Sequence, residues 1–151
     1  VKESAYLHML TYLAGIIYHL GTFLAIFLFI AGLFNIWLQG WYMWAAVALL
    51  SAAGISGTAI LIKRIRKHEL RTLSNPDDYI SNILVTAFQL ISTVVLIEPA
   101  YIPVYFVVSS LLLLYFPLGK LKHAVYFFAA RYHLGFFYGW RNVWPPKPVK
   151  K

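Results

Sequence analysis

The chain has 151 residues, of which 61% are hydrophobic and 12% are charged. This composition excludes an ordinary soluble domain, and four apolar segments of roughly 17 to 25 residues, each long enough to cross hydrocarbon, take up most of the length. The formal net charge is +8 and there is no cysteine, which excludes disulfides and iron–sulfur ligation by this chain.

We predict an all-α, polytopic membrane four-helix bundle in a single domain. After the fourth span an aromatic helix is expected to lie at the membrane interface or against a partner, and a proline-rich tail is expected to be extended. The spans are expected over about 9–38, 42–62, 79–97 and 104–123, the interfacial helix over about 124–138 and the tail over 142–151.

The positive charges follow a pattern that membrane orientation explains without nucleic acid. Five of the thirteen lysines and arginines lie in 63–71 and seven follow from Lys120 onward, whereas the loops 35–41 and 98–103 contain none. Cytoplasmic segments are enriched in Lys and Arg, so both termini and the middle loop are predicted to be cytoplasmic, which requires an even number of spans.

The first span carries His19, with Gly15 one helical turn before it on the same face. A bare backbone beside an imidazole would admit a flat macrocycle, although glycine also serves plain helix packing in membranes. No cleavable signal is expected, because this apolar run is too long for a signal core.

The second and third spans carry patterns of helix packing. Residues 51–58 are mostly small, which favours close helix contact. On the third span Asn82, Thr86, Gln89 and Thr93 share one face, which predicts hydrogen bonds between helices or, alternatively, part of a quinone-lining wall. The aspartates of the turn before it are suited to cap this helix.

The fourth span ends in an unusual sequence. Pro117 and Gly119 are expected to kink or loosen the helix, and His123 follows Lys120 and Lys122. A histidine at the edge of hydrocarbon is costly without a partner and therefore marks a functional site.

His19 and His123 are expected at similar depth on helices that face each other, which fits bis-histidine ligation of one b haem. The alternative is that each bridges helices by hydrogen bonds. Lys120 and Lys122 would pair with haem propionates, or would serve topology alone. His8 and His133 form a second pair at matching depth, which would hold a second haem. The alternative is that both are interfacial histidines.

Several segments resemble the membrane subunit of respiratory nitrate reductase, the gamma family, and the related membrane cytochromes of sulfite-reduction and heterodisulfide-reductase complexes. The resemblance runs from about 12 to 132. Its motifs are 17–21 (IYHLG), 59–63 (AILIK), 76–79 (PDDY), 111–123 (LLLLYFPLGKLKH) and Arg131-Tyr132.

The resemblance implies a five-span cytochrome with two b haems that passes electrons between a membrane quinone and a cytoplasmic iron–sulfur subunit. By position, His19 and His123 would hold the cytoplasm-side haem. The places of the outer haem ligands hold Phe29 and Tyr105. Both ligands are missing together, and so is the first span, which indicates a reduced, four-helix, single-haem relative.

The predicted function is a haem-bearing, electron-transfer subunit of a quinone-linked respiratory oxidoreductase, not catalytic alone, in a prokaryotic cytoplasmic membrane. Its partners would be quinone or menaquinone, lipid and an iron–sulfur subunit in a hetero-oligomer. Eighteen residues of helix separate His123 from Tyr105, about 27 Å, so the quinone is expected nearer the haem, beside Tyr18, Thr22 and Ser110.

The alternative function is a haem-free anchor that tethers a redox partner through the basic loop and tail. A small transporter subunit is disfavoured, because no charged residue lies in the middle of a predicted span to mark an ion path.

Overall fold

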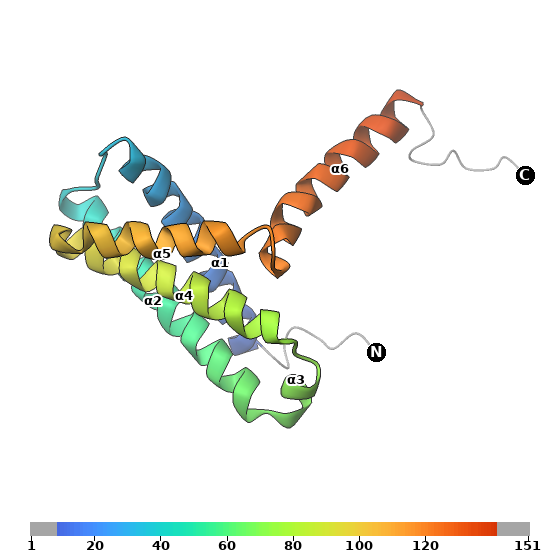
Figure 1. Ribbon diagram of the computed structural model, residues 1–151, viewed down its shortest axis with the longest axis horizontal. Helices are drawn as coiled ribbons and strands as arrows, with labels where there is room; N and C mark the ends of the chain where they lie inside the picture. Colours follow the sequence, from blue (N-terminus) through green and yellow to red (C-terminus); the bar gives the residue numbers. More distant parts are fainter. Residues whose placement is uncertain (1–8, 142–151) are drawn as a thin grey trace, which may run out of the picture.

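The computed structural model describes residues 9–141, which form helices joined by short turns and contain no strand. Figure 1 shows the long helices before residue 116 gathered in a bundle and the last helix standing apart from them. The elements are α1 (Met9–Leu33), α2 (Gly40–Arg66), α3 (His68–Thr72), α4 (Pro76–Ile97), η2 (Pro99–Tyr101), α5 (Ile102–Tyr115), η3 (Lys120–Lys122) and α6 (His123–Trp140).

Three of these helices, α1, α2 and α4, are long and apolar enough to cross a membrane. A further segment is long and apolar enough only when its two bent parts are taken together, namely Pro99–Tyr115 and Lys120–Trp140, which meet at 79°. The η2 and α5 helices together rise about 27 Å, close to the roughly 30 Å of a hydrocarbon core. The chain is therefore a multi-pass, all-helical membrane protein.

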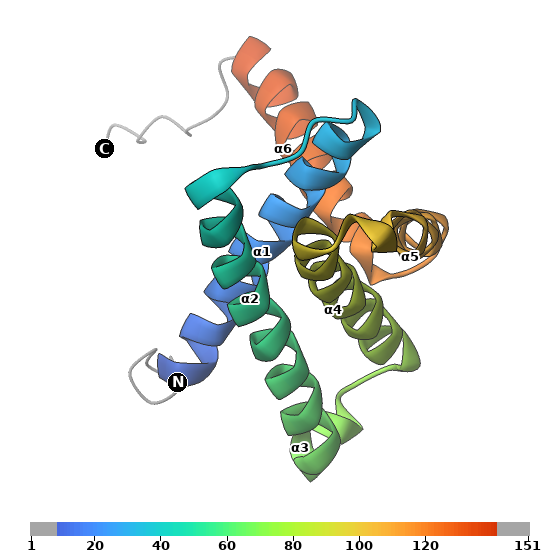
Figure 2. The ribbon, with the colours of Figure 1, turned by 90° about the vertical axis from the view of Figure 1, so that its left-hand side faces the viewer.

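Small residues let the helices approach closely. α1 packs on α2, α2 on α4, and α4 on α5, with a smaller contact between α1 and α4 (Figure 2). Gly21 of α1 lies against Ala53 of α2, and Gly57 of α2 faces Thr86 of α4 and the ring of Tyr18. The small residues predicted to form a packing face in the second span are thus confirmed in that role.

The polar face predicted on the third span is also confirmed to make contacts between helices. The amide nitrogen of Gln89, fully buried in α4, donates to the Tyr18 carbonyl at 2.9 Å and to the Thr22 hydroxyl at 2.7 Å. The Tyr18 hydroxyl donates to the Asn82 carbonyl at 3.4 Å. These bonds join α1 to α4 where the surroundings offer no water.

Two of the predicted boundaries are displaced by backbone chemistry. α1 ends at Leu33 and not near residue 38, because Asn35 has a φ of 56° and turns the chain. Asparagine tolerates this left-handed conformation better than most residues. The expected loop before the third span is partly helical, since α2 continues to Arg66 and α3 follows it.

The fourth span was predicted over about 104–123, with a kink or loosening at Pro117 and Gly119. The helix α5 ends at Tyr115, and a turn over Phe116–Gly119 leads into η3 and α6. Proline cannot continue the hydrogen-bond pattern of a helix, and Pro117 stands in this turn. The kink expected from Pro117 and Gly119 is confirmed, but it is a full bend and not a local loosening.

We predict that Gly21→Ala lowers the free energy of unfolding. The added Cβ would overlap the Cβ of Ala53, which is attached directly to backbone and cannot rotate away, so α1 and α2 must separate. Overpacking of this kind costs about 1–3 kcal/mol. The measurement is a denaturant titration in detergent micelles, followed by circular dichroism.

The matched control is Gly135→Ala in α6, where an added Cβ has no neighbouring atom within 4 Å among the described residues. An equal loss of stability in both variants would contradict close packing at Gly21.

Candidate functional site

The bend between α5 and α6, which we term the elbow (residues 116–123), is held against the start of α4. Gly119 is buried there, and a Cβ on it would meet the Tyr115 ring and the Asp77 carboxylate. Glycine is the residue that permits this approach. The Lys120 amide then donates to Asp77 at 2.6 Å.

Two carboxylates at the first turn of α4 organise this end of the bundle. Asp77 accepts hydrogen bonds from the Tyr115 hydroxyl, the Ser81 hydroxyl and the Lys120 amide. Asp78 accepts from the Lys120 ammonium at 2.7 Å and lies 3.3 Å from the guanidinium of Arg64 in α2.

The Asp78 carboxylate also accepts a hydrogen bond from the Asn75 backbone amide at 2.9 Å, which confirms the expected capping role. The pair therefore joins α2, α4 and the elbow.

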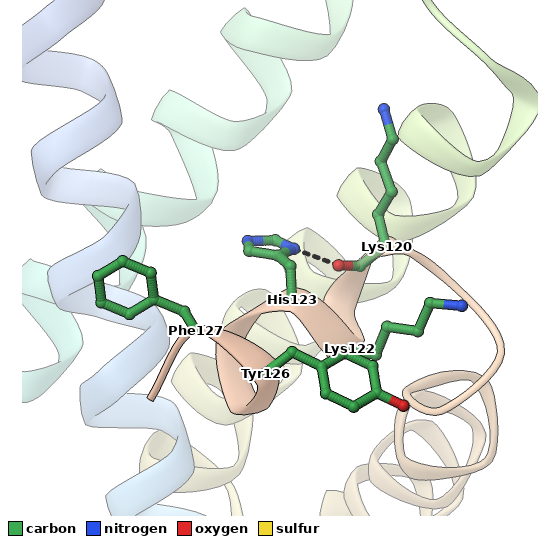
Figure 3. Close-up of a pocket in the computed structure, with 5 residues that line it drawn as sticks. All are labelled: Lys120, Lys122, His123, Tyr126 and Phe127. Carbon is green, nitrogen blue, oxygen red and sulfur yellow. Dashed lines mark hydrogen bonds between the residues drawn. The ribbon is translucent and has the colours of Figure 1, made fainter. Parts of the chain in front are cut away.

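An open groove of about 610 Å³ lies at the elbow. It is shallow and wide open to its surroundings, unlike the enclosed clefts that bury most of a small ligand. Its lining combines three of the predicted site residues with two aromatic ones, namely Lys120, Lys122, His123, Tyr126 and Phe127 (Figure 3). These residues are neighbours in the sequence, and neither His19 nor Gly15 lines the groove.

The imidazole of His123 is turned toward the backbone. Its Nδ1 contacts the backbone carbonyl of Lys120, and a carbonyl oxygen only accepts, so Nδ1 is the donor when the two are hydrogen-bonded. The ring lies away from both ammonium groups (Figure 3). Histidines that bind metals characteristically donate their second ring N–H to a carbonyl or carboxylate in this manner.

His19 lies on α1 and is exposed, with its ring 6.0 Å from that of Tyr18. The backbone of Gly15, one turn earlier, borders open space, because an added Cβ there has no atom within 4 Å among the described residues. This face of α1 is free to meet a flat group, another helix or lipid.

The structure does not bring His19 and His123 into contact. No hydrogen bond or ring contact between them is found within residues 9–141. Tyr18, beside His19, bonds to Asn82 and Gln89, whereas the elbow bonds to Asp77, five and twelve residues earlier in α4. At about 1.5 Å per residue, the points on α4 that bond to Tyr18 lie about 8 to 18 Å from the point that bonds to the elbow.

The residues predicted to line a quinone site do not all lie together. Tyr18 and Thr22 surround the side chain of Gln89, whose carbonyl oxygen is buried and has no hydrogen-bond partner in the described part of the chain. The Thr22 hydroxyl donates to the Tyr18 carbonyl at 2.8 Å. Ser110 is exposed on α5 and makes no hydrogen bond to this cluster among residues 9–141.

Phe29 and Tyr105, at the places of the outer haem ligands in the resembling family, lie together. Their ring centroids are 6.4 Å apart, and the Tyr105 ring is fully buried and stacks on Phe88 at 6.0 Å. Trp37 adds a further edge contact with Tyr105 at 6.1 Å. Aromatic rings therefore pack the space between the outer parts of α1 and α5.

The remaining predicted pair is only partly described. His133 is exposed on α6, with its ring stacked 6.4 Å from Phe137, whereas His8 and the tail 142–151 lie outside the described residues. Within residues 9–141 no cluster of three or more His, Asp or Glu side chains could hold a metal ion. A site of two histidines does not require such a cluster.

Sequence reasoning missed the anchoring role of Asp77 and the groove residues Tyr126 and Phe127. A usable signal was present, because Asp77 and Asp78 are an adjacent acidic pair between two strongly basic segments. Comparison of the chain with protein-family models, curated proteins and solved structures finds no match.

We predict that Asp77→Ala loosens the elbow. The variant removes the acceptor of the Tyr115 hydroxyl and of the Lys120 amide, so the Lys120 N–H should exchange with solvent severalfold faster. Hydrogen exchange of the full chain in nanodiscs measures this rate.

The control is Glu69→Ala in α3, which removes an exposed carboxylate that makes no hydrogen bond or ion pair among the described residues. Unchanged exchange in Asp77→Ala would show that Asp77 does not hold the elbow.

Proposed function

We propose that the chain is a membrane cytochrome b subunit that passes electrons between quinone and the iron–sulfur centres of a partner. The observation that carries the proposal is the orientation of His123. Its Nδ1 is turned to the Lys120 carbonyl, and the ring borders an open groove beside Tyr126 and Phe127. That is the arrangement expected of an imidazole prepared to bind iron.

One haem b is proposed, which His123 and His19 would hold and which would supply reversible one-electron chemistry. His123 would have to move toward the level of His19 to do so, since their anchoring points on α4 differ by about 8 to 18 Å. Gly15 would leave room beside His19. Lys122 is exposed and makes no ion pair within the described range, so its ammonium can neutralise a propionate. Lys120 would have to share its ammonium with Asp78.

The single-haem form is supported by Phe29 and Tyr105. These positions meet from α1 and α5, as an outer ligand pair would, and both side chains are aromatic rings that cannot bind iron through nitrogen. The resemblance predicts that two such positions lie opposite each other. Their contact supports the assignment of α1 and α5 to the two haem-bearing helices.

The orientation proposed is with both termini in the cytoplasm of a prokaryote. Support comes from one end of the bundle, where Lys63, Arg64 and Lys120 lie close to the first turns of α1 and α4. The opposite end carries Trp41 and Tyr101, both exposed aromatics typical of a membrane interface. An iron–sulfur partner in a hetero-oligomer would then dock at the basic end.

A quinone or menaquinone site is proposed at Tyr18 and Thr22, with Ser110 as a further lining residue. The support is the carbonyl oxygen of Gln89, a buried acceptor that lacks a donor in the described part of the chain. A buried polar atom without a partner is costly, and the hydroxyl of a quinol would satisfy it. Proton exchange would then belong to the quinone.

The second candidate is a haem-free anchor of a redox complex. It is favoured by one observation, that α6 is exposed along its whole length and offers a large surface to a partner. The two functions differ in a single measurable property, since only the first gives a reduced b-type absorption band.

We predict that His123→Ala and His19→Ala each remove the b-type absorption band from the purified complex. The reason is that either change leaves iron with one imidazole ligand at most. Haem content per chain is measured by pyridine haemochrome absorbance, and added imidazole is expected to restore part of the band in a His123→Gly variant.

His68→Ala is the matched control, because His68 is an exposed histidine of α3 on the same end of the bundle. It should keep the full band. A wild-type complex that folds and assembles without any haem would overturn the cytochrome and leave the anchor.

We predict that Thr22→Val raises the KM for quinol severalfold while haem content stays unchanged. The substitution removes the acceptor of a Gln89 N–H and so disturbs the amide that would meet quinol. Steady-state quinol oxidation by the complex measures the change.

Thr58→Val is the control, since the Thr58 hydroxyl likewise donates to a carbonyl four residues earlier, at 2.8 Å, but has no second helix as partner. Equal kinetics in the two variants would argue against a quinone at Gln89.

A further inference from the structure

The helix α6 stands outside the bundle. Every residue from His123 to Trp140 is exposed, and the helix contacts η3 but packs on none of α1, α2, α4 or α5 in the part of the chain described. Both views show it extending away from the point where α5 ends (Figures 1 and 2). Eighteen residues with so many aromatic side chains must be covered by something other than this bundle.

The direction of α6 indicates what covers it. The segment Pro99–Tyr115 rises about 27 Å, close to the thickness of a hydrocarbon core, and the following segment turns from it by 79°. A helix nearly perpendicular to a membrane span runs along the membrane surface. Hydrogen bonds of the elbow to Asp77 hold this direction relative to α4.

The two sides of α6 differ in charge, and both carry aromatic rings. One stripe at helical spacing is apolar and uncharged, and consists of Val125, Phe128, Tyr132 and Phe136. The other side carries Arg131 and Arg141, whose guanidinium carbons lie 5.1 Å and 3.8 Å from the ring centroids of Phe127 and Phe137. These rings cover the aliphatic parts of the arginines and leave the charges exposed.

The charge of this part of the chain has one sign. From residue 99 to the end the sequence has seven lysines and arginines and neither aspartate nor glutamate. A cationic helix of this kind is complementary to a surface of anionic phospholipids. Tyr126, Tyr138 and Trp140 add rings with polar edges, which favour the head-group region.

We propose that α6 is a membrane-surface helix that binds anionic phospholipid head groups, with the stripe Val125, Phe128, Tyr132 and Phe136 in the acyl region and Arg131 and Arg141 at the phosphates. This inference is independent of haem or quinone, because it rests on the bend, the exposure and the charge of α6 alone.

The chain lacks cysteine, so single cysteines can carry spin labels without background. Phe128→Cys and Phe136→Cys report on the apolar stripe, and Phe127→Cys and Leu134→Cys report on the other side, all at exposed positions. The full chain is placed in nanodiscs of phosphatidylcholine with or without phosphatidylglycerol. Collision rates with oxygen and with a water-soluble nickel complex are then measured at each label.

The expected ratio of oxygen to nickel collisions is severalfold higher at Phe128 and Phe136 than at Phe127 and Leu134, and phosphatidylglycerol should increase the difference. Equal access of the nickel complex to both sides would overturn the proposal. Protection of both sides from oxygen and nickel alike would also overturn it, since that pattern indicates a second protein copy around α6.

The charge requirement is tested with the double variant Arg131→Gln, Arg141→Gln. Each arginine near an anionic surface is worth about a fivefold change in lipid binding. The pair should therefore abolish most of the effect of phosphatidylglycerol on the labels. The matched control, Arg66→Gln with Arg71→Gln, removes two exposed cations of the α2–α3 segment. It should leave the effect of phosphatidylglycerol on the labels unchanged. An unchanged lipid effect in the α6 variant would contradict head-group binding by these arginines.

Discussion

The end of the molecule that carries the elbow and its groove is held together by the carboxylates of Asp77 and Asp78. They follow one another in the first turn of α4, where the helix dipole favours negative charge. Between them they bind the Tyr115 hydroxyl, the Lys120 amide and ammonium, and the Arg64 guanidinium. Without this pair the turn at Phe116–Gly119 would have no attachment to the bundle. The position of His123 and the direction of α6 are consequences of the same attachment.

A second constraint lies deeper, where α1, α2 and α4 meet. Glycines on α1 and α2 bring the backbones together, and Gln89 then bonds across to α1 through both hydrogens of its amide. In a bilayer, small residues provide the close contact and buried polar groups supply direction. This arrangement satisfies the donors of Gln89 but leaves its carbonyl oxygen unpaired in the described chain. A polar atom in that condition is a natural place for a ligand with a hydroxyl group.

The proposed electron-transfer role and the proposed lipid contact of α6 meet at the elbow. The groove with His123 opens where the chain leaves the fourth crossing, and α6 starts from the same residue. A helix held on the membrane surface would limit the movement of His123 relative to α1. The depth of His123 in the membrane relative to His19 would then depend on lipid as well as on protein contacts.

Composition and periodicity alone determined that the chain is an all-helical membrane protein, that small residues line the packing face of α2, and that one polar stripe joins α4 to its neighbours. Each of these follows from local rules, since apolar length, residue size and helical spacing act within one segment. Pro117 and Gly119 also predicted a break in the helix near His123. Only the tertiary structure decided that this break is a 79° bend held by Asp77 and that Phe29 meets Tyr105. Those features arise from contacts between residues far apart in the chain, and no local pattern specifies which distant group a side chain will meet.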